Sequence, residues 1–568
     1  MELITDLRAI RKEIGLRLEE TSLYPKLNLD AYKDVAPILI KEKEKKYSLL
    51  VKEVETGNFT RGGSAEPVIK KYKVRLLYYS SYFTWDKLAS GREEFPPDET
   101  AALRRVCKGK ELRVHADMVL DRFRRLSQGF DLAFASPPDF VGKTWAYELD
   151  KKKVEAAFLG RRRDVNQWAV QAVEGALQIS PEDKATVKKF LSRPPFRSFH
   201  VLNGLMKEMG FANVLASSPI NLQEMTGIPY DRIKESLLSI YTRGKVYLLS
   251  QRPLKNAGWA KGIAFKKGER IFATLREAIQ TLSGNGPLGV EEKNLDIGRA
   301  MTLGLNRLQN ASNLFRAWRE VRSGQDLGAY ILAALGTKEA MEGALNMAEK
   351  KLQDRAPVYE KDVEKKFNQL LKEFEKNKKS PLQLEPYFMV MHAGIRTPYP
   401  SLPGFFRLSK KMNSLKLDAG ILAKDRGLIL ACSDLARSIV TNEQGKDLYA
   451  LLERAMLEAA IPGGREGQTG EDVYWAGMEL LLKEEKKLRE RKLLPQEGRL
   501  QRDYNRDIGH TFGKQESTTL FFKKGEKGQT LQQGMVSAIE YQWPYQGYAL
   551  GIEDMFVVGP KYGINITR

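Results

Sequence analysis

The stretch that decides the fold lies near the carboxy terminus and reads NRDIGHTFGKQESTT over residues 505–519 and GMVSAIEYQWPYQGYALGIEDMFVV over residues 534–558. It contains His510, and Glu540 and Glu553 adjoin apolar runs that are typical of strands. Rigid strands can direct a histidine and two glutamates toward one point, which suits a metal site. The same residues also fit a solvated loop with two surface acids, so this stretch alone leaves both interpretations open.

Two aspartates upstream are candidate partners of these residues. Residues 414–440 read SLKLDAGILAKDRGLILACSDLARSIV, in which Asp418 ends one apolar run and Asp434 follows another. Successive side chains of a strand point to opposite faces, so two strands can direct both aspartates at the same point. The sequence thus offers four carboxylates and one imidazole for a single site.

The order Asp418, Asp434, His510, Glu540, Glu553 resembles the metal-binding set of the pita-bread metallopeptidases, which include aminopeptidase P, prolidase, methionine aminopeptidase and creatinase. The short sequence motifs around these residues match the family as well. LDAG and SDLARS resemble the aspartate pair, GHTFG the histidine loop, and GMVSAIE and GIEDMFVV the two glutamate strands. Five elements in family order make the resemblance specific.

The resemblance implies an α/β plus α+β architecture that covers about residues 190–568. Residues 190–310 resemble a creatinase-like amino-terminal α/β domain, and residues 311–568 a pita-bread catalytic domain. Residues 1–185 form an amino-terminal extension of unknown type, with a mixed α/β pattern. Helical periodicity predicts helices over 311–351, broken near Ser323-Gly324 and Gly336, and over 363–379.

The resemblance also implies two divalent ions, with manganese first and cobalt, iron or zinc as alternatives. Asp418 and Asp434 would hold one ion, His510 and Glu540 the other, and Asp434 and Glu553 would bridge them. Carboxylates and imidazole without thiolates suit such ions. The implied reaction is hydrolysis of a peptide or amide bond by a shared water, with Glu540 and His510 as catalytic residues and Glu540 as proton acceptor.

Several positions depart from the family pattern. The two aspartates are sixteen residues apart, more than is usual in the family; Asp434 is preferred over Asp425 because SDLARS matches the family's motif. The positions expected to hold substrate-binding histidines carry Ser401, Arg506 and Ser517, and an arginine common in proline-specific members is Gly551. His392 is either a structural histidine or a displaced substrate-binding one. We therefore expect an altered substrate preference, with weak activity on X-Pro peptides.

Composition narrows the remaining classes of function. The chain has 568 residues, two cysteines and a net charge of +21, and the sequence shows neither a secretory signal nor an apolar run long enough for a membrane span. This predicts a cytoplasmic protein, and the resemblance implies a homodimer. Because the positive charge is diffuse, nucleic-acid binding is not favoured. The alternative is a catalytically weak or inactive pita-bread module that binds a protein or nucleic-acid partner.

Overall fold

The computed structural model describes most of the chain beyond residue 141 and five short segments before it. The described residues are 38–41, 74–77, 112–114, 119–127, 132–134, 142–195, 198–233, 237–254, 260, 262–323, 325–393, 408, 414–493, 500, 507–514, 520–543 and 550–568. Most of the predicted extension therefore lies outside the described residues. Its first four described strands form two pairs: β1 (Ile38–Lys41) with β2 (Val74–Leu77), and β3 (Leu112–Val114) with β4 (Leu132–Phe134).

The amino-terminal domain is built on a seven-stranded sheet with strand order β11-β10-β6-β7-β8-β5-β9. Pairing is parallel between β6, β10 and β11 and antiparallel elsewhere. The strands are β5 (Thr144–Leu149), β6 (Asn213–Ala216), β7 (Leu238–Thr242), β8 (Lys245–Ser250), β9 (Phe265–Phe272), β10 (Leu288–Val290) and β11 (Leu308–Asn310).

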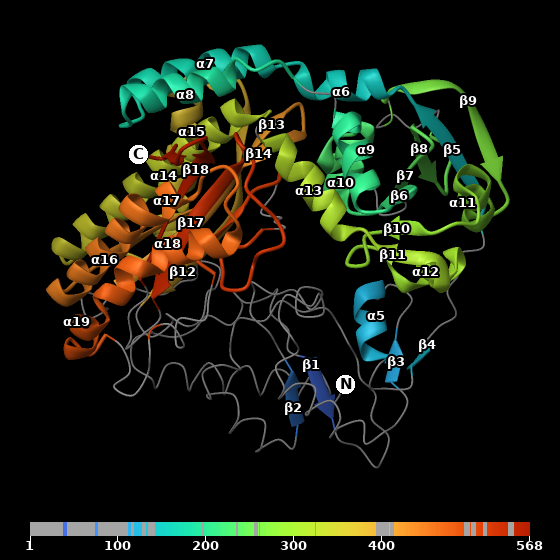
Figure 1. Cartoon of the computed structure of the whole chain (residues 1–568). Helices are drawn as coiled ribbons and strands as arrows, with labels where there is room; N and C mark the ends of the chain where they lie inside the picture. Colours follow the sequence, from blue (N-terminus) through green and yellow to red (C-terminus); the bar gives the residue numbers. More distant parts are fainter. Residues whose placement is uncertain are drawn as a thin grey trace.

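Helices and short 3₁₀ turns complete this domain, and α13 leads from it to the second domain (Figure 1). They are α5 (Leu120–Leu126), α6 (Lys151–Leu159), α9 (Ser198–Glu208), α10 (Pro219–Thr226), η2 (Tyr230–Arg232), α11 (Leu275–Ser283), α12 (Ile297–Leu303), η4 (Leu305–Arg307) and α13 (Ser312–Ser323). The start of this domain was predicted at residue 190, but the sheet includes β5 from before that point. The three domain boundaries remain predictions.

Two helices that begin before residue 190 cover the second domain instead of the first. Helix α7 (Arg162–Gly175) packs against α8 (Pro181–Leu191) and against α14 (Leu327–Gln353), a helix of the second domain. In Figure 1 the pair lies across the top of that domain, reached through α6. The chain thus contributes to both domains before it enters the predicted creatinase-like region.

The second domain is built on an eight-stranded sheet that contains all the predicted metal ligands except Asp434. Its strand order is β12-β13-β15-β18-β17-β16, with β14 paired to β13 and β19 to β18. The strands are β12 (Gln383–Ala393), β13 (Ser414–Asp425), β14 (Leu428–Cys432), β15 (Leu435–Val440), β16 (Gly509–Thr511), β17 (Val536–Trp543), β18 (Leu550–Val558) and β19 (Gly563–Asn565).

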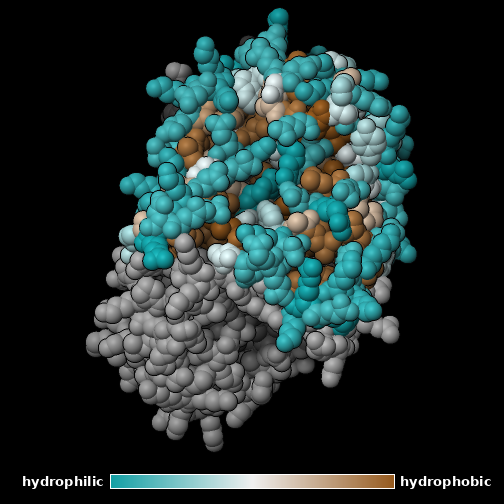
Figure 2. All heavy atoms as spheres, turned by 90° about the vertical axis from the view of Figure 1, so that its left-hand side faces the viewer, coloured by the Kyte–Doolittle hydropathy of each residue, from teal (hydrophilic) through white to brown (hydrophobic). Residues whose placement is uncertain are grey.

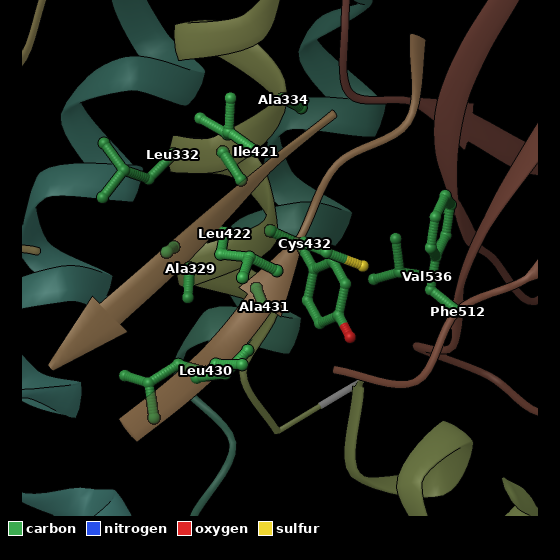
Figure 3. Packing of buried hydrophobic residues seen from close by; sticks show 14 of the residues in the cluster. Ala329, Leu332, Ala334, Ile421, Leu422, Leu430, Ala431, Cys432, Phe512 and Val536 are labelled. Carbon is green, nitrogen blue, oxygen red and sulfur yellow. The ribbon is translucent and has the colours of Figure 1, made fainter. Parts of the chain in front are cut away.

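Two groups of helices cover this sheet. Helices α14 and α15 (Glu360–Asn377) pack together and against β12 to β14, where Leu332 of α14 belongs to the same apolar cluster as Ile421 and Leu430 (Figure 3). A second apolar cluster joins β17 and β18 to the later helices. These are α16 (Glu443–Ala455), the π-helical turn η6 (Met456–Ala460), α17 (Ile461–Gly463), α18 (Gly470–Lys483) and α19 (Glu485–Glu490).

The helix predictions for this region are confirmed except at one glycine. Helix α13 ends at Ser323 and α14 begins at Leu327, so the predicted break is present, and α15 matches the predicted helix over 363–379. The break predicted at Gly336 is wrong, because α14 continues through it. A Cβ at Gly336 would lie 3.1 Å from Leu384, so the glycine permits close packing within the helix.

The surface of the second domain is mainly hydrophilic on the side shown in Figure 2, with hydrophobic side chains visible between polar ones. Helix α19 and the end of α18 carry exposed ion pairs such as Lys483–Glu479, which is typical of a solvated helix of mixed charge. Within the described part of the chain, every helix is too short or too polar to cross a bilayer.

Candidate metal centre

Three of the predicted carboxylates lie in one row across the sheet of the second domain. The Cα of Asp418 pairs with Ala436 of β15, Ala436 pairs with Glu553 of β18, and Glu553 pairs with Glu540 of β17. Residues directly opposite each other on antiparallel strands project to the same face. Asp418 was expected to end an apolar run, but it lies inside β13. Its backbone is therefore held by strand pairing on both sides.

Asp434 and His510 reach the same place from outside this row. Asp434 lies in the connection between β14 and β15, and His510 lies in β16 opposite Ala538. His510 Nε2 is 3.6 Å from Asp434 Oδ2, and one ligand atom each from Asp434, His510 and Glu553 lie within 4.8 Å of one another. All three residues are buried. This is the compact triad expected of a site for a divalent cation.

Asp425, the other aspartate considered from sequence, lies elsewhere. It ends β13, and its Oδ2 is 3.2 Å from Arg426 Nη2 at the turn into β14. The wide spacing between Asp418 and Asp434 is therefore taken up by a β13–β14 hairpin. The tip of this hairpin meets the amino-terminal domain, since Gly427 accepts a hydrogen bond from the backbone of Tyr230.

Lys416 brings a positive charge into the carboxylate set. Its Nζ lies 2.9 Å from Asp418 Oδ2 and 2.8 Å from Glu540 Oε1, and its side chain is only 1% exposed. Burial by itself would lower the pKa of Lys416, but Asp418 and Glu540 outweigh this effect and raise it above its ordinary value. The ammonium is therefore charged, and it binds one carboxylate from each side of the site.

Glu553 shows that the carboxylates crowd one another. Burial raises the pKa of Glu553 well above its ordinary value, and the negative charges of Asp434, Glu540 and Asp418 raise it further. Its Oε1 has no hydrogen-bond partner among the described residues. A buried carboxylate oxygen without a hydrogen-bond partner is well suited to bind a cation. The donor set therefore fits a divalent metal ion.

A buried ionic network fixes the strand that carries Glu553. Arg437 Nη1 donates to the backbone carbonyl of Glu553 at 2.7 Å, and Arg437 Nη2 lies 2.5 Å from Asp554 Oδ1. Asp554 is fully buried and also accepts from Arg568 Nε at 2.6 Å and from Asn565. Although burial alone would raise the pKa of Asp554, Arg437 and Arg568 lower it. The network therefore holds Asp554 ionised behind the site.

The histidine is positioned by its own strand and by the linker helix. His510 Nδ1 lies 3.1 Å from the carbonyl of Thr511, and the ring meets Phe512 at a centroid distance of 5.0 Å. Thr511 Oγ1 donates to Glu320 of α13 at 2.9 Å. Helix α13 thereby joins the histidine strand to the amino-terminal domain.

The predicted substrate-binding residues are only partly placed. Ser401, Arg506 and Ser517 lie outside the described residues, so their roles remain predictions. The backbone of His392 is described and pairs with Lys416 in the β12–β13 ladder, but its side chain is not among the described ones. This register places His392 two residue pairs along the ladder from Asp418, which pairs with Val390.

Sequence reasoning missed Lys416 and Arg437, although Lys416 directly precedes the LDAG motif and Arg437 lies in SDLARS. Lys416 precedes Asp418 by two residues, and the two-residue period of a strand puts both on one face. That signal was lost because Asp418 was interpreted as the end of its run. Arg437 belongs to SDLARS, but its partner Asp554 is 117 residues away, and nothing local indicates that pairing.

Residues 332–560 match the model of metallopeptidase family M24. The second domain is therefore similar to metallopeptidase family M24. The matched region contains every predicted metal ligand, so the resemblance inferred from the sequence motifs is confirmed. No curated protein is similar enough to the chain to count as a match.

Solved structures show that the fold extends beyond the M24 domain. A dipeptidase from Pyrococcus horikoshii OT3 superposes with a TM-score of 0.50 at 20% identity and covers 66% of this chain and 98% of its own. The amino-terminal domain of the FACT complex subunit SPT16 from chickpea, Cicer arietinum, gives 0.50 at 13% identity, over 65% and 95%. The prolidase from Pyrococcus furiosus gives 0.47 at 17% identity, over 64% and 98%.

At these identities the likeness concerns the fold alone. The predicted fold class, a creatinase-like amino-terminal domain ahead of a pita-bread M24 domain, is confirmed. Because a dipeptidase and a domain from a subunit of a protein complex share this fold, the fold does not choose between a hydrolase and a binding module. That choice depends on the residues of the M24 site.

Proposed function

We propose that this protein is a metal-dependent hydrolase that cleaves an amide-type bond with water, and that Asp434, His510 and Glu553 hold the metal. The observation that supports this most is the convergence of those three buried side chains within the region that matches the M24 family model. A pure binding module has no physical need to gather buried carboxylates that repel one another. The alternative of a module without hydrolytic activity is therefore less well supported.

The roles of the side chains follow from their positions. A divalent ion in the triad supplies a Lewis acid and an acidified water, with manganese as the first candidate. Glu540 lies on β17 opposite Glu553 and, as a carboxylate, can accept the water's proton. The water oxygen bonds to the carbonyl carbon, the carbon–nitrogen bond breaks, and the proton passes to the leaving nitrogen.

The substrate is proposed to be a peptide or amide other than the usual X-Pro substrates. Donors must meet the negative charge that develops on the carbonyl oxygen, and the loss of one donor typically costs about 10²–10³ in rate. Serines stand at two of the expected histidine positions, and a serine hydroxyl is shorter than an imidazole. Arg506 could supply a donor from another angle and would then favour an anionic substrate.

The corresponding prediction is that X-Pro dipeptides are hydrolysed at least about 10²-fold more slowly than the best substrate of a mixed panel. The measurement is the initial rate of the manganese-loaded protein on X-Pro peptides, non-proline peptides and acidic peptides. The Glu540→Gln variant, purified in parallel, controls for contaminating peptidases. If X-Pro bonds were the best substrates, the assignment of Ser401, Arg506 and Ser517 would be wrong.

A further inference from the structure

Lys416 occupies the gap between two residues that the family resemblance assigns to different metal ions. By that resemblance, Asp418 belongs to one ion and Glu540 to the other. The Lys416 ammonium lies 2.9 Å from Asp418 Oδ2 and 2.8 Å from Glu540 Oε1, so it contacts a ligand of each. Gln542 also donates to Glu540 Oε1. Two carboxylates of the predicted set are thus engaged by donors of the chain itself.

The lysine fits here because its neighbour on β18 is a glycine. A Cβ at Gly551 would lie 2.4 Å from both Cδ and Cε of Lys416, closer than any real contact. Gly551 is the position where the family resemblance leads us to expect an arginine. The Lys416 stem lies across this space and is enclosed there, so the ammonium cannot leave the site without rearrangement of packed neighbours.

The charge balance of the site favours a single divalent ion. Asp418, Asp434, Glu540 and Glu553 can carry four negative charges in a largely buried space. Lys416 offsets one of them, and a single divalent ion would offset two more. A second divalent ion would make the set net positive and would lie close to a buried ammonium, which is costly at low dielectric.

We propose that the Lys416 ammonium replaces one of the two metal ions, so that each chain binds a single divalent ion between Asp434, His510 and Glu553. This inference rests on the proposed function only for the presence of that one ion. Lys416 then acts as a positioning residue that fixes Asp418 and Glu540 where a second ion would otherwise hold them. This role of Lys416 also explains why Asp418 and Glu540 are not part of the compact triad of Asp434, His510 and Glu553.

The test is the metal stoichiometry of wild-type protein and of Lys416→Ala, which removes both the charge and the side-chain volume. Chelator-treated protein would be titrated with Mn²⁺ in a calorimeter, and bound manganese would be counted by elemental mass spectrometry after gel filtration. We expect one ion per wild-type chain and two per Lys416→Ala chain. Circular dichroism and the elution volume check that the variant is folded.

Lys424→Ala is the matched control. Lys424 lies on the same strand and is 2% exposed, but its ammonium pairs with Glu385 at 2.8 Å and Asp231 at 3.3 Å. Its removal should leave one ion per chain. A second variant, Asp418→Asn, should also keep one ion, whereas Glu553→Gln should lose it.

The outcomes separate this inference from the proposed function. Two ions per wild-type chain would overturn the role of Lys416 and leave the metal-dependent hydrolase intact. One ion in both wild type and Lys416→Ala would likewise show that the lysine does not exclude a second ion. No ion in either protein would overturn both proposals. If Lys416→Ala fails to fold, the wild-type count still tests the proposal, because two ions per wild-type chain would overturn it.

Discussion

Glu540→Gln is expected to lower the rate of amide hydrolysis by about 10²–10⁴-fold, the usual contribution of a general base. The amide keeps the size of the side chain and can still bond Lys416, but it cannot accept the water's proton. His510→Ala should abolish turnover by removing one of the three triad ligands. The measurement is the turnover of manganese-loaded protein on the best substrate of the peptide panel.

Glu479→Gln is the matched control for this experiment. Glu479 lies on α18, is 67% exposed and pairs with Lys483 in an i,i+4 arrangement far from the triad in sequence. Its variant should turn over at the wild-type rate. Unchanged turnover in both Glu540→Gln and His510→Ala would show that any hydrolytic site lies elsewhere in the chain.

Arg437→Met is expected to destabilise the M24 domain by about 3 kcal/mol, the low end of the range for breaking a buried ion pair by removing one partner. The variant leaves the backbone carbonyl of Glu553 without its guanidinium donor and weakens the pairing of Asp554. Arg568 and Asn565 still donate to Asp554, so we expect the loss of unfolding free energy to lie at the low end of that range. The measurement is the midpoint and slope of urea unfolding.

Arg491→Met provides the comparison on the surface. Arg491 is 51% exposed and lies 2.8 Å from Asp447, and an exposed pair of this kind contributes at most about 1 kcal/mol. If Arg437→Met were no more destabilising than Arg491→Met, the network behind Glu553 would not stabilise the fold. If metal binding remained normal as well, Arg437 would not position the site.

The sequence predicted the ligand set because each ligand lies in a short motif with its own strand pattern. They could not show which ligands come together, since that depends on strand register. The pairing of Asp418 with Ala436, and of Ala436 with Glu553, brings the β13 and β18 carboxylates together across 135 residues of chain. Register of this kind depends on the whole sheet and not on local periodicity.

Two other differences have local physical causes. Gly336 was interpreted as a helix break on propensity, but close packing against Leu384 makes a glycine useful inside α14. Strand β5 was placed outside the creatinase-like domain because its partners β8 and β9 come about a hundred residues later in the chain. In both cases tertiary contacts decided what the local sequence left open.

The most direct test of the metal centre is the melting temperature of wild-type protein and His510→Ala, each measured after chelation and after addition of Mn²⁺. An ion that binds only the folded state at 100 times its dissociation constant adds about 2.7 kcal/mol of stability. We predict that Mn²⁺ raises the melting temperature of the wild type by several degrees, a shift of the size that such a gain produces, and leaves His510→Ala unchanged. Equal melting temperatures of chelated and manganese-treated wild type would contradict a metal site at Asp434, His510 and Glu553.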